Sequence, residues 1–198
     1  MGDTLRPVHT APQLHDVLAA VRDGARRLGV EAYLVGGFVR DRLLGTEGKG
    51  FLHLVHNLPQ ERLSIAAAGV AAAQAALGWT LEYAKERTAF GRPIGNFQVI
   101  RHKFAEMATK IETARQMVYT TAWRFQNGEY PVREITMAKL YAARIAVEVA
   151  DECIQIHGGN GYMKEYGIER TWRDLRLNRI GAGTDEIMLE VIGRSYGL

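Results

Sequence analysis

The chain has 198 residues, of which 47% are hydrophobic and 24% are charged. These proportions are typical of a globular protein of one domain, or one domain and a small attachment, and they exclude collagen-like, low-complexity and disordered classes. The net charge of +3 arises from 25 basic and 22 acidic residues without a dense basic block, so we expect no nucleic-acid partner.

No targeting or membrane-spanning segment is predicted. The first thirty residues lack the apolar core of a signal peptide, and the longest run of apolar and glycine residues, 65–73, is far shorter than a membrane span. The single cysteine, Cys153, excludes an internal disulfide and a cysteine-based zinc site. We therefore expect a cytoplasmic protein that does not bind a membrane.

Residues 1–45 are predicted to form a short α/β-like extension. Residues 12–28 have the pattern of an amphipathic helix, and residues 32–35 form a strand candidate that ends at two glycines. A glycine-rich segment, 45–50, follows the extension. The predicted domains are thus this extension, 1–45, and a second domain, 46–198.

The second domain is predicted to be all-α. Pro59 is a helix-start signal, Asn127-Gly128 and Gly158-Gly159 are stop signals, and Thr184 is a good N-cap. Apolar residues at three- and four-residue spacings connect these signals. The expected helices cover residues 59–87, 97–126, 131–158, 167–178 and 184–197. Long helices with short connections predict an up-and-down four-helix bundle.

Five segments of this domain carry recognisable motifs. They are LLGTEGKGF at 43–51, LPQERL at 58–63, RTAFGRPI at 87–94, IHGGNGY at 156–162 and IGAGTDEI at 180–187. In this order they resemble the C-terminal helical domain of the acyl-CoA dehydrogenase family, and LPQERL is most similar to the long-chain and isovaleryl branches. The resemblance implies a flavoprotein oxidoreductase of fatty acid metabolism that introduces an α,β double bond into an acyl-CoA.

The resemblance also implies further domains. Intact members have an N-terminal helical domain and a middle β-domain before the bundle, and residues 1–45 resemble neither. We therefore expect the C-terminal domain only, and activity of the isolated chain is left open. A non-catalytic, self-associating helical module is the alternative of a different class.

Residues 33–45, YLVGGFVRDRLLG, resemble a second family. They are similar to the opening strand and glycine turn of tRNA nucleotidyltransferases and poly(A) polymerases. In that family two metal-binding aspartates should follow within a couple of dozen residues, whereas here no aspartate lies between Asp41 and Asp151. We expect a fused fragment without nucleotidyltransferase activity.

Glu61 is the candidate catalytic base. The family reaction needs a carboxylate in an apolar pocket, where desolvation raises its pKa. Most members carry that glutamate where this sequence has Ala182, and the long-chain and isovaleryl branches carry it at the position of Glu61. By the same resemblance Arg62, Ala182 and Gly183 bind substrate. The alternative for Glu61 is a helix-dipole contact in the first turn of a helix.

The resemblance implies that FAD is the cofactor, bound mainly by a neighbouring subunit. This predicts a homo-oligomer, either a dimer or a dimer of dimers, with electron-transfer flavoprotein as electron acceptor. Ordinary structural alternatives exist, such as a solvated arginine at a helix end, a glycine C-cap or carboxylates that cap a helix. The FAD contacts implied are Arg87, Phe90, Gln98, Gln155, Ile156, His157, Gly158, Gly159, Thr184, Asp185 and Glu186.

No metal site is predicted. His53, His56, Asp151 and Glu152 do not have the spacing of metal ligands. The aromatic residues are expected in the core or at bundle interfaces and not as a platform for stacking bases. The aromatic residues concerned are Trp79, Tyr83, Trp123 and Phe125.

Overall fold

The structure is a computed structural model that describes residue 27 and residues 50–198, the side chains of residues 50–54 excepted. Apart from Arg27, the extension predicted over residues 1–45 lies outside this part of the chain. One compact unit comprises Val55–Leu198, and it is described by itself below.

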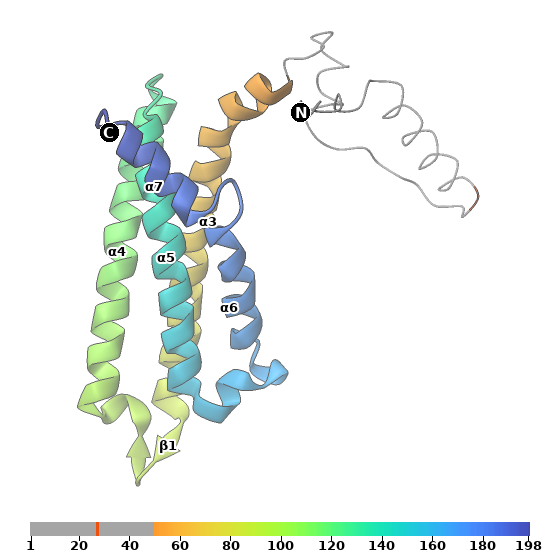
Figure 1. Cartoon of the computed structure of the whole chain (residues 1–198). Helices are drawn as coiled ribbons and strands as arrows, with labels where there is room; N and C mark the ends of the chain where they lie inside the picture. Colours follow the sequence, from red (N-terminus) through yellow and green to blue (C-terminus); the bar gives the residue numbers. More distant parts are fainter. Residues whose placement is uncertain (1–26, 28–49) are drawn as a thin grey trace, which may run out of the picture. The chain divides into compact units, whose positions relative to one another are not determined.

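Five α-helices make up almost all of this unit. They are α3 (Gly50–Glu86), α4 (Gln98–Gln126), α5 (Val132–His157), α6 (Ile168–Arg176) and α7 (Asp185–Arg194). The helices α3 to α6 lie side by side in alternating directions, and α7 crosses one end of them (Figure 1). The predicted all-α, up-and-down four-helix bundle is confirmed.

Short elements connect the helices. The strands β1 (Thr88–Ala89) and β2 (Arg92–Pro93) form a two-residue antiparallel pair between α3 and α4, with Thr88 opposite Pro93. Four 3₁₀ segments complete the connections: Ile94–Asn96, Gly158–Tyr162, Lys164–Tyr166 and Leu177–Arg179.

The first helix begins earlier than predicted. The sequence places Pro59 in the first turn, but α3 starts at Gly50 and contains Pro59 in its interior. Proline removes one backbone hydrogen bond and crowds the preceding turn, which bends a helix without necessarily ending it. Glu61 therefore lies in the fourth turn of α3, so the helix-dipole alternative for this residue does not apply.

The core lies where α3 and α4 pack on α5. The contact between α3 and α5 is close, because a Cβ added at Gly69 would lie 3.6 Å from the carbonyl oxygen of Ala142 and 3.7 Å from Cβ of Ala146. The alanine-rich half of α3 thus serves tight helix packing. The core residues include Ala66, Val70, Ala73, Met107, Ile111, Ala114, Val118, Ala142, Ile145, Ala146 and Val149.

By length and composition alone, the part of α3 from Val55 to Glu86 could cross a membrane. Its buried face packs in the bundle core through Ala66, Val70 and Ala73. A core helix of this composition meets the same criteria as a membrane span, so we assign α3 to the bundle.

Cys153 is fully buried in α5, with its Sγ 3.9 Å from Sδ of Met107. Burial raises the pKa of the Cys153 thiol from 9.0 to about 11. Between these values the native state keeps a proton that the unfolded chain has lost. The contribution of this thiol to the free energy of unfolding is therefore fully present below pH 9, and it is lost as the pH rises through the folded pKa of about 11.

We expect the bundle to lose more stability between pH 9 and pH 11 than a Cys153→Ala variant loses. The steepest difference should approach about 1.4 kcal/mol per pH unit, the free energy equivalent of one pKa unit. Urea unfolding of both proteins across this range measures the two slopes. The cavity left by alanine lowers the free energy of unfolding by the same amount at every pH, so it does not change the slope. Equal slopes of the two proteins would contradict the prediction.

Candidate active site

Glu61 and Ala182 line one pocket, although they are far apart in the sequence. Glu61 lies on the exposed side of α3, and Ala182 lies in the loop that precedes α7. The pocket has a volume of about 530 Å³ and is completed by Asn57, Gln60, Ser64 and Ile65. A carboxylate at position 61 and one introduced at position 182 would therefore face the same space.

The backbone of the loop is in a conformation that favours glycine. Ala182 has φ of 54° and Gly183 has φ of 112°, both in the left-handed region. A Cβ at Gly183 would also lie 2.7 Å from Cε of the buried Met188. The loop thus needs glycine at position 183, and it turns sharply just before α7 begins.

Arg62 lies behind the pocket wall. Its guanidinium is buried, and Nε donates a hydrogen bond to the carbonyl oxygen of Ala182 at 3.1 Å. Burial lowers the pKa of the Arg62 guanidinium. The side chain thus ties α3 to the loop, and the contact of Arg62 with substrate stays a prediction.

Thr184 and Asp185 begin α7. The hydroxyl of Thr184 accepts a hydrogen bond from the backbone N–H of Ile187 at 3.5 Å, which confirms the predicted N-cap. Asp185 is buried, and its Oδ2 accepts hydrogen bonds from Arg179 Nη2 at 2.6 Å and from Arg144 Nε at 3.1 Å.

These ion pairs change the role of Asp185. Burial favours a raised pKa for its carboxyl, but the hydrogen bonds from Arg179 and Arg144 outweigh burial and lower the pKa. Both arginines compete with any ligand for Oδ2, so this geometry does not support the predicted FAD contact through that atom. Its other oxygen, Oδ1, is buried without a partner among the described residues. Glu186, the next residue, is exposed.

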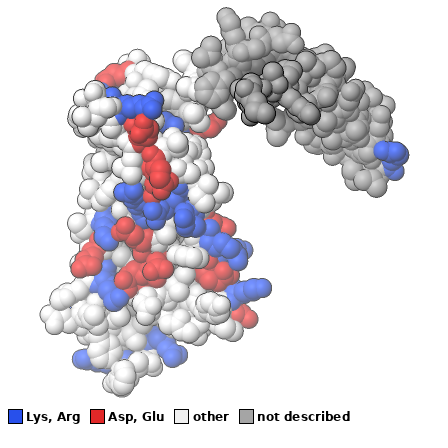
Figure 2. All heavy atoms as spheres, in the orientation of Figure 1, with Lys and Arg blue, Asp and Glu red and all other residues white. Residues whose placement is uncertain are grey.

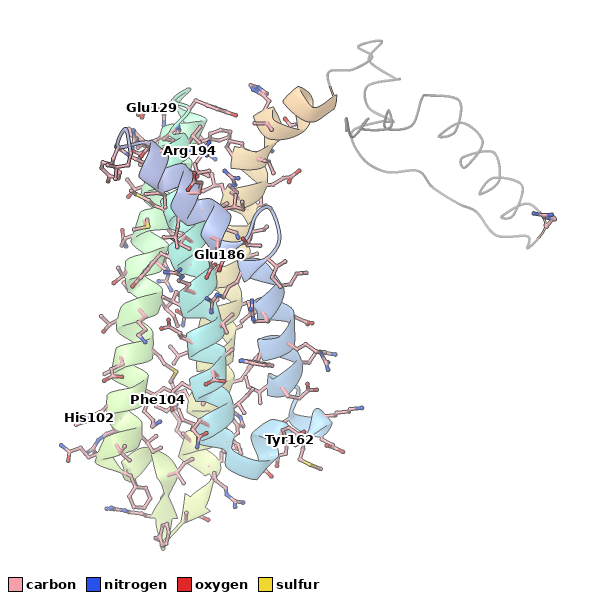
Figure 3. The ribbon with its side chains drawn as sticks, viewed as in Figure 1. His102, Phe104, Glu129, Tyr162, Glu186 and Arg194 are labelled. Carbon is pink, nitrogen blue, oxygen red and sulfur yellow. The ribbon has the colours of Figure 1, made fainter. Side chains whose placement is uncertain are left out.

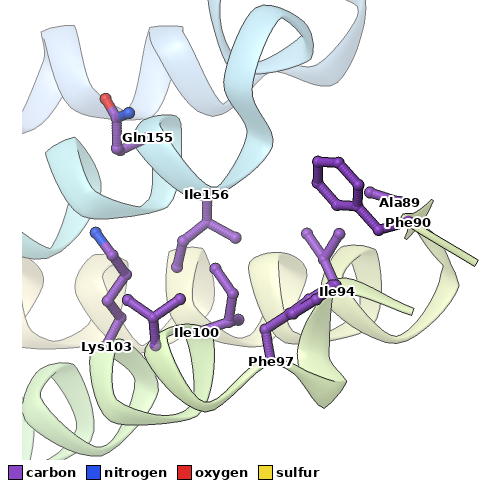
Figure 4. Close-up of a pocket in the computed structure, with 9 residues that line it drawn as sticks. Ala89, Phe90, Ile94, Phe97, Ile100, Lys103, Gln155 and Ile156 are labelled. Carbon is purple, nitrogen blue, oxygen red and sulfur yellow. The ribbon is translucent and has the colours of Figure 1, made fainter. Parts of the chain in front are cut away.

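A second pocket lies at the other end of the bundle, beside β1 and β2 (Figure 4). Its volume is about 400 Å³ and its lining is mostly apolar, with Lys103 and Gln155 as the polar side chains. Lys103 also forms an ion pair with Glu152. The lining residues are Ala89, Phe90, Ile94, Phe97, Val99, Ile100, Lys103, Gln155 and Ile156. Three predicted FAD residues, Phe90, Gln155 and Ile156, thus meet here.

Phe90 is conspicuous in this pocket because its side chain is 95% exposed. Its φ of 52° lies in the left-handed region, which bulky residues rarely adopt. An exposed aromatic ring on a strained turn is available to stack against a flat ligand or another chain. Arg87 and Gln98 are exposed nearby in sequence but do not line the pocket.

The turn after α5 is held by Tyr83 of α3. The Tyr83 hydroxyl donates to the carbonyl oxygen of His157 at 3.2 Å and accepts from Nδ2 of Asn160 at 3.0 Å, and its ring stacks on the His157 ring. Nδ1 of the buried His157 lies 2.8 Å from the carbonyl oxygen of Cys153, which assigns the ring hydrogen to Nδ1. Gly158, with φ of 59°, is the predicted C-cap.

The predicted FAD residues therefore fall into two groups. Arg87, Phe90, Gln98 and residues 155–159 belong to the end with β1, whereas residues 184–186 belong to the end with α7 (Figure 1). Figure 3 shows Glu186 in the upper half of the bundle and Tyr162 near its lower end. Both ends can be located on α5, where Lys139 contacts the loop before α7 and Ile156 lines the second pocket. These two residues are about 26 Å apart along the helix axis.

Charge is mixed over the bundle. Basic and acidic side chains alternate along its middle in the face shown in Figure 2, and the end with β1 is mostly uncharged. No single-sign field covers this face. Among the described residues, no group of three His, Cys, Asp or Glu side chains is arranged to hold a metal ion.

The family model for the acyl-CoA dehydrogenase C-terminal domain matches residues 48–197. The chain belongs to the acyl-CoA dehydrogenase family. It is 50% identical over 152 residues to the probable acyl-CoA dehydrogenase YngJ of Bacillus subtilis, covering 77% of this chain and 40% of that protein. It is 41% identical to the caffeyl-CoA reductase-Etf complex subunit CarC of Acetobacterium woodii, and this match also covers 77% of this chain and 40% of that protein.

Solved structures agree with the bundle. An acyl-CoA dehydrogenase from Geobacillus kaustophilus matches with a TM-score of 0.75 and 43% identity, over 77% of this chain and 40% of that one. The FAD complex of PigA matches with a TM-score of 0.72 and 33% identity, over 77% of this chain and 40% of that one. Proteins of this family are FAD-dependent flavoproteins.

The match is confined to the bundle. The chain spans about 40% of the length of the relatives it matches. The family model begins at residue 48, so it gives no support to the resemblance of residues 33–45 to tRNA nucleotidyltransferases, and these residues lie outside the described part of the chain.

Several residues of the site were not predicted from the sequence. Lys139, which donates to the carbonyl of Gly183, continues the apolar face of α5, and its only signal is a lysine at a core position. Tyr83, predicted as a packing residue, also holds the 157–160 turn. Asn57, Gln60 and Ser64 line the Glu61 pocket without any motif of their own.

Proposed function

We propose that this chain supplies the C-terminal helical domain of an FAD-dependent acyl-CoA dehydrogenase, with Glu61 as the catalytic base. The observation that carries the proposal is that Glu61 and Ala182 line one pocket. These are the two positions from which, by the family resemblance, a base can reach the substrate. A carboxylate at the first and a methyl group at the second leave Glu61 as the one base of the pair.

Glu61 would take the α-proton of the acyl-CoA thioester. When bound, FAD supplies the oxidant that accepts the β-hydrogen as hydride. The carboxylate of Glu61 must be ionised before the reaction and become the carboxylic acid after it. Glu61 is exposed in the described part of the chain, so a surface from another domain must cover the pocket to exclude water.

The pocket at the end with β1 fits the cofactor. Its apolar walls suit a flat aromatic ring, and the amide of Gln155 and the ammonium of Lys103 can bind polar atoms. Phe90 offers an uncovered ring for stacking. Arg87 and Gln98 lie on the adjoining segments and would add polar contacts to the same cofactor.

The separation of the two FAD groups supports a homo-oligomer. One end of the bundle would contact one flavin, and the other end would contact a second flavin that is held mainly by a neighbouring copy. Exposed apolar side chains support association as well, because Trp79 and Trp123 are each more than half exposed. Of the two places expected for these tryptophans, their exposure excludes the core and leaves an interface of the bundle.

The remaining assignments follow the family resemblance. We propose an acyl-CoA as substrate, fatty acid metabolism as the setting, electron-transfer flavoprotein as the electron acceptor and the cytoplasm as the location. The relation to a reductase-Etf complex subunit supports the choice of acceptor.

We expect the purified chain to sediment as an oligomer that carries flavin absorbance after incubation with FAD. Sedimentation velocity recorded at the protein and the flavin wavelengths tests association and cofactor binding in one experiment. Phe90→Ala is the matched variant, since it removes the exposed ring without touching the core, and it should lower the bound flavin. A colourless oligomer would favour the non-catalytic module instead, and a colourless monomer would contradict both proposals.

A further inference from the structure

Lys139 is a buried lysine that the proposed reaction does not use. Its side chain is 0% exposed and is the largest fully buried side chain in the described part of the chain. Lysine is almost never fully buried without a partner, because transfer of an ammonium group from water into a protein core is costly. The partner here is a backbone carbonyl, since Nζ donates to the oxygen of Gly183 at 2.5 Å.

Two successive carbonyl groups of the loop before α7 each accept a hydrogen bond from a buried basic side chain. Arg62 Nε reaches the oxygen of Ala182 from α3, and Lys139 Nζ reaches the oxygen of Gly183 from α5. Ala182 has positive φ, which a residue other than glycine keeps only when the surroundings hold it, and Gly183 continues the turn with positive φ. The two side chains satisfy carbonyl groups that face the bundle interior, so they hold the strained turn from two helices.

The charges around Lys139 are partly balanced. Asp185 and Arg62 are the charged groups that act on it, and Asp185 is itself paired with Arg144 and Arg179. Burial lowers the pKa of Lys139, with Asp185 acting in the opposite direction. Nζ of Lys139 is thus held inside the bundle by one carbonyl, that of Gly183, and the charge of Asp185 favours its protonated form.

We propose that Lys139 is a positioning residue that fixes the backbone of Ala182 and Gly183, and thereby sets where the side chain at position 182 enters the Glu61 pocket. The loop forms one wall of that pocket, so its position determines the space left for whatever binds beside Glu61. The proposal rests on the proposed function only in treating this pocket as the substrate site. The holding of the loop by Lys139 is independent of flavin and substrate.

The test uses the full chain with Ala182→Cys as a reporter. Cys153, the only native cysteine, is fully buried, so a neutral thiol reagent reports on position 182. Adding Lys139→Met keeps an unbranched side chain that is one atom shorter and removes the hydrogen bond. We expect the thiol introduced at position 182 to react about tenfold faster, because the loop opens locally at low free-energy cost once it is released. Amide hydrogen exchange over residues 181–187 should accelerate by a similar factor.

Ile111→Ala is the matched control, since Ile111 is a buried residue of α4 in the core cluster. It should destabilise the bundle while leaving the reactivity at position 182 unchanged at temperatures below unfolding. An equal effect of Lys139→Met and Ile111→Ala, or no effect of Lys139→Met, would overturn the proposal.

One further measurement applies if Lys139→Met does not fold. In the native chain, the Lys139 ammonium should give an NMR signal in slow exchange with water, and fast exchange would overturn the proposal. None of these readouts involves FAD or acyl-CoA, so failure here and failure of the proposed function are distinguishable.

Discussion

Replacing Glu61 with glutamine is expected to lower acyl-CoA dehydrogenation about 10²–10⁴-fold while flavin stays bound. The measurement needs residues 43–198 joined behind the N-terminal and middle domains of a long-chain acyl-CoA dehydrogenase, because this chain spans about 40% of its relatives. Glutamine keeps the size and hydrogen-bonding shape of the side chain but cannot accept the α-proton. The loss therefore belongs to the chemical step, and single-turnover flavin reduction by acyl-CoA measures it.

Glu86→Gln is the matched control, since Glu86 is an exposed glutamate at the opposite end of the same helix. It should leave the rate of flavin reduction unchanged. Combining Glu61→Gln with Ala182→Glu should recover part of the activity, because position 182 faces the same pocket. Wild-type turnover in Glu61→Gln would mean that the base lies elsewhere and that the long-chain and isovaleryl assignment is wrong.

Replacing Gly161 with alanine is expected to destabilise the bundle by roughly 2–4 kcal/mol, within the range of severe single substitutions. A Cβ at this position would lie 2.5 Å from the carbonyl oxygen of Ile154 and 3.0 Å from Cβ of His157. The clash is with backbone, which cannot rotate away as a flexible side chain can. The 158–162 segment must then move off the end of α5. Thermal or urea unfolding of the two chains measures the loss.

Gly159→Ala makes the same chemical change two residues away and serves as the control. Nothing lies within 4 Å of a Cβ added there, and its φ is not in the left-handed region. We expect its free energy of unfolding to stay within about 0.5 kcal/mol of wild type, as for surface substitutions away from special features. If both variants lost a similar free energy of unfolding, the close packing around Gly161 would not be what makes glycine necessary there.

Most of the fold follows from local signals in the sequence. The stop at Asn127-Gly128, the C-cap at Gly158 and the N-cap at Thr184 bound helices within one or two residues of where the structure has them. Pro59 is the exception, because a proline weakens a helix locally while the packing of the long α3 stabilises it as a whole. Apolar periodicity then specified the buried faces of α4 and α5.

The site could be predicted only in part. The motifs of the sequence indicated Glu61, Ala182 and Phe90 through a family resemblance, and the resemblance to acyl-CoA dehydrogenases over residues 48–197 is confirmed. The roles of Arg62 and Lys139, and the contact of Asp185 with Arg144, depend on partners that lie 41 to 120 residues away in the sequence. No local pattern encodes such pairs, because hydrogen bonds between distant residues exist only once the helices have packed.

The helical class and the helix ends other than the start of α3 could be derived from the amino-acid sequence, since these depend on turn chemistry and periodicity within a few residues. The residues that carry the family motifs were indicated by the resemblance to acyl-CoA dehydrogenases. Packing of the helices was needed to show that Glu61 and Ala182 share a pocket, that two buried cations hold the 182–183 turn, and that the predicted FAD residues divide between the two ends of the bundle. The physical reason is that an antiparallel bundle brings distant segments together at each end, and only the packed helices place the buried charges opposite their partners.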